Sequence, residues 1–266
     1  MAQDSARGTR NGQECQEKKA KPTAGEVFPD GTMLELVRDS ANPTRPALLH
    51  FHGKQTTIGR EIEHEHARYV PVDLDSTLFR QLHLPAKSMP YGSTPELFDQ
   101  IYGLIMRRSD LSDDAASLVT FFVFSTFFCD CLQLAPCLLL QGEGTEAAAL
   151  LRILSWVCRH PLLLVNPRLG REPEHLNFTS LIYLSQPEAK IEKLLAVSHL
   201  SKFGVFRHGS LHEICGAKAI FVRSPSLRSP LADECLRISV ASTRASQIRR
   251  RDARTTGRGG PAGEVT

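Results

Sequence analysis

The segment APCLLLQGEGTEAAALLRIL, residues 135–154, decides the fold of this chain. Residues 136–140 form a short apolar run, which is typical of a strand that is buried on both faces. A glycine turn with Gly142 and Gly144 follows, and residues 145–154 carry apolar side chains at helical spacing. The segment therefore predicts a strand, a tight turn and a helix in succession.

The flanking sequence continues this alternation. Ser93 or Thr94 has the chemistry of a helix N-cap, with Pro95 in the first turn, and predicts a helix that ends near Arg108. A largely apolar helix is predicted from residue 112 to residue 132, before the segment above, and another helix from 188 to 200, after it. Further strands are predicted at residues 162–165, 179–184, 204–207 and 219–222. Strands that alternate with helices predict an α/β domain with a parallel sheet over residues 85–225.

Three other segments differ from this domain in composition. Residues 1–28 are polar and lack apolar periodicity, which predicts a disordered N-terminus. Residues 29–84 contain short β-leaning runs separated by turn residues, and they predict a small β-rich segment. Residues 226–266 lose periodicity and predict an irregular to disordered tail.

Size and composition are those of an ordinary globular protein. The 266 residues suffice for one large domain or two small ones, with 41% hydrophobic and 23% charged residues. The net charge is +3. Residues 241–266 hold six arginines and two acidic residues, a net +4, so the rest of the chain carries −1. The basic balance therefore comes from the tail and not from a basic face of the folded part.

Cysteine usage and hydropathy predict a cytoplasmic protein without a membrane span. The chain has seven cysteines, an odd number, and no secretory signal, so we expect them to be reduced and mostly buried. Residues 118–140 are as long and apolar as a spanning helix. However, Asp130 and Gln133 interrupt this stretch and Pro136 breaks it, which favours a buried core helix.

The order of these motifs resembles the core of P-loop ATPases of the AAA-like and phage-type primase/helicase group. The likeness is carried by an apolar helix, the strand and glycine turn at 135–144, the helix LLRIL, the CRHPLLL stretch and the strand TSLIYL. It covers residues 97–225, about half of the chain. The chain also resembles uncharacterised bacterial proteins that keep this frame with an altered loop. The resemblance implies a P-loop NTPase-like, partly parallel sheet with flanking helices.

The same resemblance implies where a nucleotide would bind, and there the chain departs from the pattern. A working P-loop reads G-x-x-x-x-G-K-[ST], with the glycine turn, here Gly142 and Gly144, holding phosphates. Glu146 and Ala147 stand where lysine and the hydroxyl residue belong, and Thr145 lies one position early. After the strand at 179–184, Glu188 is the first carboxylate, in place of an acidic pair.

Lysine and magnesium provide most of the electrostatic stabilisation in phosphoryl transfer. With this degenerate Walker A loop the sequence predicts a non-catalytic, regulatory or structural protein without a cofactor. By resemblance, it would be associated with DNA replication or helicase-type machinery through an unidentified protein partner. Two alternatives stay open. One is an NTPase that binds ATP and Mg²⁺ through an unconventional loop, with Thr145 and Glu188. The other is a binding module that uses residues 29–84.

Two further groups of residues are candidates for binding. His64 and His66 in EIEHEH would share one face of a strand, and His50 and His52 have the same spacing. If the two strands pair, four histidines converge on a possible metal site; the alternative is a solvated polar strand, and no metal is predicted. Arg249, Arg250 and Arg251 could contact a nucleic-acid backbone without sequence preference, or they belong to a solvated tail.

Overall fold

The computed structural model describes residues 20–167, 178–185, 189–200, 204–207, 210–223 and 233–241. The chain divides into two compact units, Met1–Asp73 and Leu74–Thr266. Three of the sequence predictions lie outside the described residues: disorder before residue 20, the role of Glu188, and the role of Arg249, Arg250 and Arg251.

The first unit consists of short strands, which were predicted from residue 29 onward. Four of them form an antiparallel sheet in the order β2(Gly25–Val27), β3(Met33–Arg38), β4(Pro46–His52) and β5(Gln55–Gly59). A second sheet has the order β1(Ala20–Thr23), β7(Ala67–Pro71) and β6(Ile62–His64), in which β1 and β7 are parallel. The range 1–28 was predicted to be disordered, but its described part, from residue 20, already forms the strands β1 and β2 because it pairs with β7 and β3. A small core is formed by Leu34, Leu48, Ile62 and Tyr69.

The second unit is built on a five-stranded sheet in which every pair of neighbours is parallel. The order across the sheet is β14(Leu236–Val240), β8(Cys137–Gly142), β13(Lys218–Val222), β10(Thr179–Leu184) and β9(Pro161–Val165). A separate antiparallel pair consists of β11(Gly204–Arg207) and β12(Ser210–Glu213). The predicted α/β class with flanking helices is confirmed, and the sheet is fully parallel instead of partly parallel.

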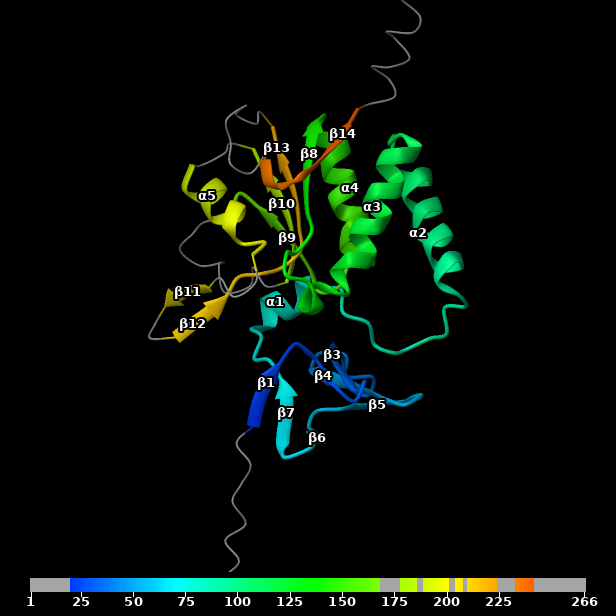
Figure 1. Cartoon of the computed structure of the whole chain (residues 1–266), viewed down its shortest axis with the longest axis vertical. Helices are drawn as coiled ribbons and strands as arrows, with labels where there is room; N and C mark the ends of the chain where they lie inside the picture. Colours follow the sequence, from blue (N-terminus) through cyan, green and yellow to red (C-terminus); the bar gives the residue numbers. More distant parts are fainter. Residues whose placement is uncertain are drawn as a thin grey trace, which may run out of the picture. The chain divides into compact units, whose positions relative to one another are not determined.

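Helices cover both faces of this sheet because the chain reverses direction within it. After β8, helix α4(Gly144–Val157) leads across the sheet to β9 at its edge, and the chain then returns strand by strand. Since crossovers between parallel strands are right-handed, the helix of the return path, α5(Ala189–Val197), must lie on the opposite face. In Figure 1, α4 and α5 lie on opposite sides of the strands.

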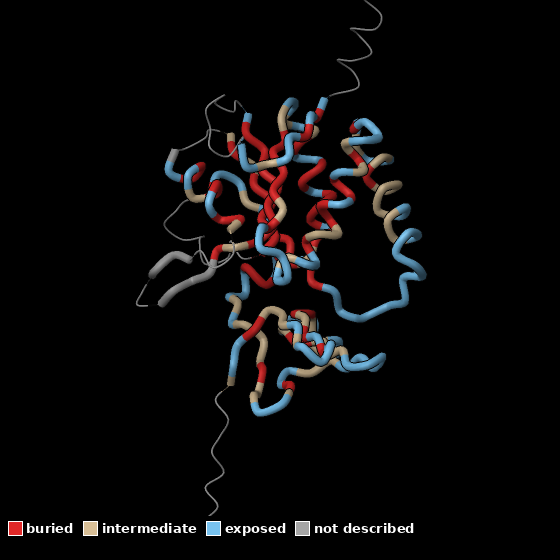
Figure 2. The backbone as a smooth tube through the Cα atoms, viewed as in Figure 1, coloured by how far each residue is buried: buried red, intermediate tan, exposed pale blue. Residues whose placement is uncertain are grey.

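The buried strand side chains therefore divide between two cores, one on each face of the sheet. On the α4 side, α2(Thr94–Arg108) and α3(Asp113–Thr126) complete the layer. The buried side chains there include Leu138, Leu140, Leu150, Leu154, Leu181 and Phe221. On the α5 side they include Cys137, Leu139, Ile182, Leu184, Leu195 and Ile220. Figure 2 shows buried positions concentrated in the strands and on the helix sides that face them.

Most predicted elements of this unit occur where the sequence indicated them, but α3 is shorter than predicted. It ends at Thr126 and not near residue 132, and a 3₁₀ turn, Cys129–Cys131, follows. The Thr126 hydroxyl donates to the Val123 carbonyl at 2.7 Å and accepts from the Arg159 N–H at 3.0 Å. Such side-chain bonds compete with the helix ladder. Phe127 and Phe128 beyond this point are exposed.

Three further features were missed by the sequence prediction. The helix α1(Ser76–Gln81) lies in the range 29–84 that was predicted to be β-rich, and its N-cap is the Asp75 side chain. The strand β14 lies in a range that was read as irregular, and Cys137 forms a disulfide with Cys235, which was expected to be reduced. The bond closes a loop with a sequence separation of 98. The other cysteines of the described ranges, Cys129, Cys131, Cys158 and Cys215, form no disulfide.

The apolar stretch tested for a membrane span is divided between α3, the 3₁₀ turn and β8. No helix in the described ranges combines the length and the hydropathy that crossing a bilayer requires.

The predicted start of α2 is confirmed by a complete capping box. The Ser93 hydroxyl accepts from the Glu96 N–H at 3.4 Å, and the Glu96 carboxylate accepts from the Ser93 N–H at 2.8 Å. We expect Ser93→Ala to lower the free energy of unfolding by about 1 kcal/mol, because a helix N–H loses its partner. Urea denaturation measures this. Ser88→Ala, in the exposed loop before α2, is the control and should change stability by much less; equal effects would contradict the capping role.

Candidate functional site

The carboxyl edge of the parallel sheet is the place where the fold can form a binding site. In open α/β sheets, ligands bind outside the carboxyl ends of the strands, at the point where the strand connections diverge. In this sheet that point lies between β8 and β13, because the connection from β8 runs toward β9 and the connection from β13 runs toward β14. Gly142, Gly144 and Thr145, the predicted nucleotide-binding residues, all follow β8 at this edge.

The connection from β8 to α4 is a single residue. β8 ends at Gly142 and α4 begins at Gly144, so only Glu143 lies between them. Glu143 is the N-cap residue of α4, yet its side chain makes no cap hydrogen bond. Its backbone N–H donates instead to the Val240 carbonyl of β14 at 3.0 Å. The turn is therefore held by the neighbouring strand.

The two glycines of this turn are required for different reasons. Gly142 has φ of 127°, a region that side chains rarely adopt, and a Cβ there would collide with the Val240 carbonyl oxygen. Gly144 leaves room for a side chain from another strand: a Cβ at this position would lie 2.6 Å from the Tyr183 hydroxyl. The turn thus packs closely against β14 on one side and against β10 on the other.

An aromatic pair fills the space beside the first turn of α4. The rings of Tyr183, on β10, and Phe221, on β13, have centroids 4.8 Å apart and are tilted by 38°. Phe221 is fully buried, and Tyr183 is half-buried with its hydroxyl beside Gly144. In the group that the sequence resembles, the residues next to this helix start hold phosphates; here a phenol occupies the neighbouring space.

The charges around the helix start are mixed. A helix N-terminus favours anions because its first N–H groups have no partners within the helix. Glu143 is exposed and Glu146 is half-buried in the first turn, so both carboxylates compete with an external anion. Arg223 follows β13 directly and is exposed, and its backbone N–H donates to the Leu184 carbonyl at 3.3 Å. Thr145 is exposed as well.

At the end of β10 a side-chain amide forms hydrogen bonds, and no acidic pair follows the strand. Asn166, just after β9, has φ of 46°, and its side-chain oxygen accepts from the Ser185 N–H at 2.9 Å and from the Ser185 hydroxyl at 3.0 Å. The hydroxyl that follows β10 is thus already used by a structural bond. No carboxylate directly follows β10, which is where the resemblance implies a magnesium ligand.

Sequence reasoning missed Tyr183, Phe221, Arg223 and Asn166 at this edge. Each lies at or directly after the carboxyl end of a parallel strand. All three of these strands, β9, β10 and β13, had been predicted, so the residues at their ends could have been collected from the sequence.

The histidine cluster in the first unit differs from the prediction. His50 and His52 on β4 lie beside His64, with ring centroids 6.3 Å apart for the first pair and 6.5 Å for His50 and His64. His66 is exposed and does not share a strand face with His64, because β6 ends at His64 and Glu65 has φ of 51°. Within the described residues, no three His, Cys, Asp or Glu side chains are arranged to hold a metal ion.

Polar side chains accompany the three clustered histidines. The His64 Nε2 lies 3.7 Å from the Asp30 carboxylate, and the Thr32 hydroxyl lies 2.7 Å from the His52 Nδ1. Burial lowers the pKa of His50, and charge on His52 and His64 would lower it further, while Asp30 acts in the opposite direction.

The most buried charge lies at the opposite, amino edge of the sheet. Lys218, at the start of β13, is inaccessible to solvent, and burial lowers its pKa to about 7. Its Nζ donates to the carbonyls of Gly216 at 2.6 Å, Ser198 at 2.8 Å and Ile214 at 3.4 Å. A perturbed lysine is a candidate for catalysis. Here all three ammonium protons have acceptors, so the side chain ties the chain after α5 to the segment before β13.

The comparisons with known proteins add little to this geometry. No protein-family model and no curated protein matches the chain. Among solved structures, the chain is similar to the VirB11 ATPase from the Brucella suis type IV secretion system in complex with sulphate. The sequences are 12% identical, with 80% of this chain and 62% of that chain covered and a TM-score of 0.21. The chain thus spans less than two thirds of that protein, and an overlap this low supports no conclusion about function.

The contact between Gly144 and Tyr183 can be tested by a double-mutant cycle. We expect Gly144→Ala to lower the free energy of unfolding by about 1–3 kcal/mol, because the new methyl group would overlap the Tyr183 hydroxyl. In a Tyr183→Phe background the same alanine should cost much less, since the hydroxyl is gone. Urea denaturation followed by the fluorescence of Trp156, which lies on α4, measures all four proteins.

Gly103→Ala is the matched control for this cycle. Gly103 lies within α2, where a Cβ would meet only the flexible end of Arg107 at 3.2 Å. It should be neutral or stabilising in both backgrounds. Equal costs of Gly144→Ala with and without the Tyr183 hydroxyl would exclude the close packing described above.

The histidine cluster predicts an acid-sensitive first unit. The lowered pKa of His50 means that the unfolded chain binds more protons than the folded unit below about pH 6.5, the ordinary histidine value. Stability is therefore full above that pH and decreases as the pH falls below it. A urea titration at pH 7.5 and 5.5, followed by the NMR amide signals of β4, measures the difference. His50→Gln should reduce the pH dependence of stability, and the exposed His66→Gln should not. If only His66→Gln reduced it, the pH dependence would not come from His50.

Proposed function

We propose that this chain is a non-catalytic P-loop NTPase-like protein with a regulatory or structural role. The observation that carries the proposal is the one-residue connection between β8 and α4. A phosphate loop wraps its ligand with successive backbone N–H groups of several residues between strand and helix. Glu143 alone cannot form such a cradle, and its N–H is already bonded to Val240.

The side chains at the same edge support the proposal. Transfer of a phosphoryl group needs positive charge where the oxyanions develop, from lysine and from a magnesium ion held by carboxylate and hydroxyl. Here the first turn of α4 carries Glu146, and the position after β10 is Ser185, bonded to Asn166. The Tyr183 hydroxyl lies beside Gly144. Tyr183 and Ser185 are thus engaged in contacts within the fold at this edge.

A role in DNA replication or helicase-type machinery is part of the proposal and rests on the sequence resemblance. In such a role the chain would act through a protein partner, and the parallel sheet would serve as a rigid scaffold. Contact with a nucleic-acid backbone through Arg249, Arg250 and Arg251 would be independent of sequence, because the tail supplies charge without aromatic side chains for stacking.

A second candidate, an NTPase with an unconventional phosphate loop, is favoured by one observation. Arg223 and Thr145 are both exposed, and they follow β13 and β8, which are neighbours in the sheet. An anion at the start of α4 would find unbonded helix N–H groups and these two side chains at the same edge. In this function Glu188 would be the acid that holds magnesium.

Calorimetry with ATP·Mg²⁺ and GTP·Mg²⁺ on the full chain separates the two candidates. The proposal expects no heat of binding up to millimolar nucleotide and no release of phosphate above the buffer rate. Micromolar binding that disappears in Thr145→Val would overturn it in favour of the NTPase. Thr56→Val is the control, because Thr56 is exposed on β5 in the other unit and should leave any binding unchanged.

A further inference from the structure

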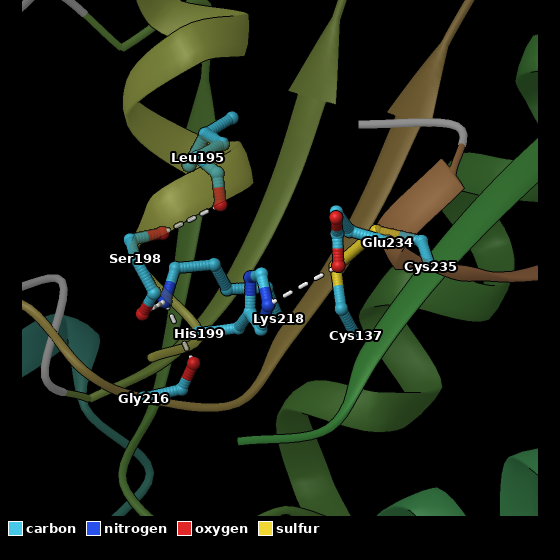
Figure 3. The surroundings of a disulfide bond; sticks show 8 residues. All are labelled: Cys137, Leu195, Ser198, His199, Gly216, Lys218, Glu234 and Cys235. Atoms are coloured by element: carbon cyan, nitrogen blue, oxygen red, sulfur yellow. Dashed lines mark hydrogen bonds and ion pairs between the residues drawn. A yellow bond between two sulfur atoms is a disulfide. The ribbon is translucent and has the colours of Figure 1, made fainter. Parts of the chain in front are cut away.

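The disulfide joins the amino ends of two neighbouring strands. Cys137 is the first residue of β8, and Cys235 directly precedes β14. Their Cα atoms are 4.8 Å apart, and Figure 3 shows the sulfur–sulfur bond together with the groups around it. Cys137 is buried and Cys235 is half-buried. The bond is therefore accessible to a small reductant from the Cys235 side.

The strand β14 has few other ties to the sheet. Among the described residues it pairs only with β8, over the register Leu236↔Leu138 to Val240↔Gly142. Of its five side chains, only Ile238 and Val240 are buried. An edge strand with one neighbour and two buried side chains is a segment of low local stability. The covalent bond at its amino end adds a further connection between β14 and β8.

The backbone segments around the two cysteines are held by different contacts. Cys137 continues into a central strand, and the preceding Pro136 carbonyl accepts from the Lys218 N–H at 2.9 Å. On the other side, the half-exposed Glu234 lies 3.5 Å from the His199 Nε2 through its carboxylate. This ion pair joins a buried ring to a carboxylate in solvent and is weak. When the bond opens, the segment at Cys235 is the one free to move.

The far end of β14 contacts the turn at the candidate site. The Val240 carbonyl accepts the Glu143 N–H, and it lies so close to Gly142 that no side chain fits between them. β14 is only five residues long, so one short strand connects the disulfide at the amino edge with the β8–α4 turn at the carboxyl edge. A change at Cys235 can therefore reach Glu143 without any other element moving.

We propose that the Cys137–Cys235 disulfide is a redox-controlled clamp that holds β14 on the sheet and fixes the turn Gly142–Gly144. A dithiol reductant opens it: the sulfur–sulfur bond takes up two electrons and two protons and becomes two thiols, while the dithiol becomes a disulfide. β14 then detaches from β8, and the Glu143 N–H loses its acceptor. This clamp operates whether or not the carboxyl edge binds a nucleotide.

The first test is whether the bond forms in the purified full chain. Alkylation with iodoacetamide without reductant, followed by mass spectrometry, should label the free cysteines that solvent reaches and leave Cys137 and Cys235 unmodified. After treatment with dithiothreitol, Cys235 should be labelled. Because Cys137 is buried, alkylation of Cys235 before reduction is enough to overturn the proposal.

The second test follows the strand and the turn by hydrogen exchange. On reduction, amides of β14 and of the peptide 141–146 should exchange at least tenfold faster, while those of α2 stay unchanged, and reoxidation should restore the original rates. Cys235→Ser should behave as the reduced protein, and Cys131→Ser, which removes an exposed free thiol, should respond as the unaltered chain does.

Two outcomes of this exchange measurement contradict the clamp. If reduction leaves β14 protected, the strand does not depend on the bond. If reduction also removes protection from α2, the disulfide stabilises the whole unit instead of controlling one strand. Reduction of the unaltered chain decides between these results even when Cys235→Ser does not fold.

Discussion

The burial of β8 on both faces is the constraint on which the rest of the second unit depends. Leu138 and Leu140 enter the core beneath α4, while Cys137 and Leu139 enter the core beneath α5. A parallel strand that is buried on both sides needs a neighbour along each edge and a layer of helices on each face. The strands β13 and β14 and the helices α4 and α5 supply these, so β8 lies between two strands and two helix layers.

The position of β8 between β14 and β13 also determines the geometry of the turn that follows it. β8 has β14 at one side, and the helix must start above β10 and β13 to cover its face. With a connection of one residue, the chain can stay paired with β14 and still start the helix above β10 and β13 only if two close approaches occur. Gly142 approaches the Val240 carbonyl, and Gly144 approaches the Tyr183 hydroxyl. In the sequence, Gly142 and Gly144 suggested a phosphate loop. Close packing against Val240 and Tyr183 explains both glycines without a bound ligand.

The elements that the sequence predicted well are those with strong local signals. A continuous apolar run bounded by Pro136 and Gly142 gives β8, and serine followed three residues later by glutamate gives the start of α2. What could not be predicted depends on partners far away in the chain. β14 shows alternation only at Ile238 and Val240, too short a pattern to identify, and spacing alone cannot pair Cys137 with Cys235. The expected histidine pair failed at Glu65, whose left-handed backbone ends the strand between His64 and His66.

The two edges of the sheet are held by different kinds of interaction. The amino edge carries the disulfide, the buried Lys218 with three carbonyl acceptors, and the pair of His199 with Glu234. The carboxyl edge is held by backbone bonds and by close packing around glycine. The covalent bond and the buried Lys218 side chain thus lie at the edge away from the turn, and the conformation of the turn depends on glycine packing and on the bond from the Glu143 N–H to the Val240 carbonyl.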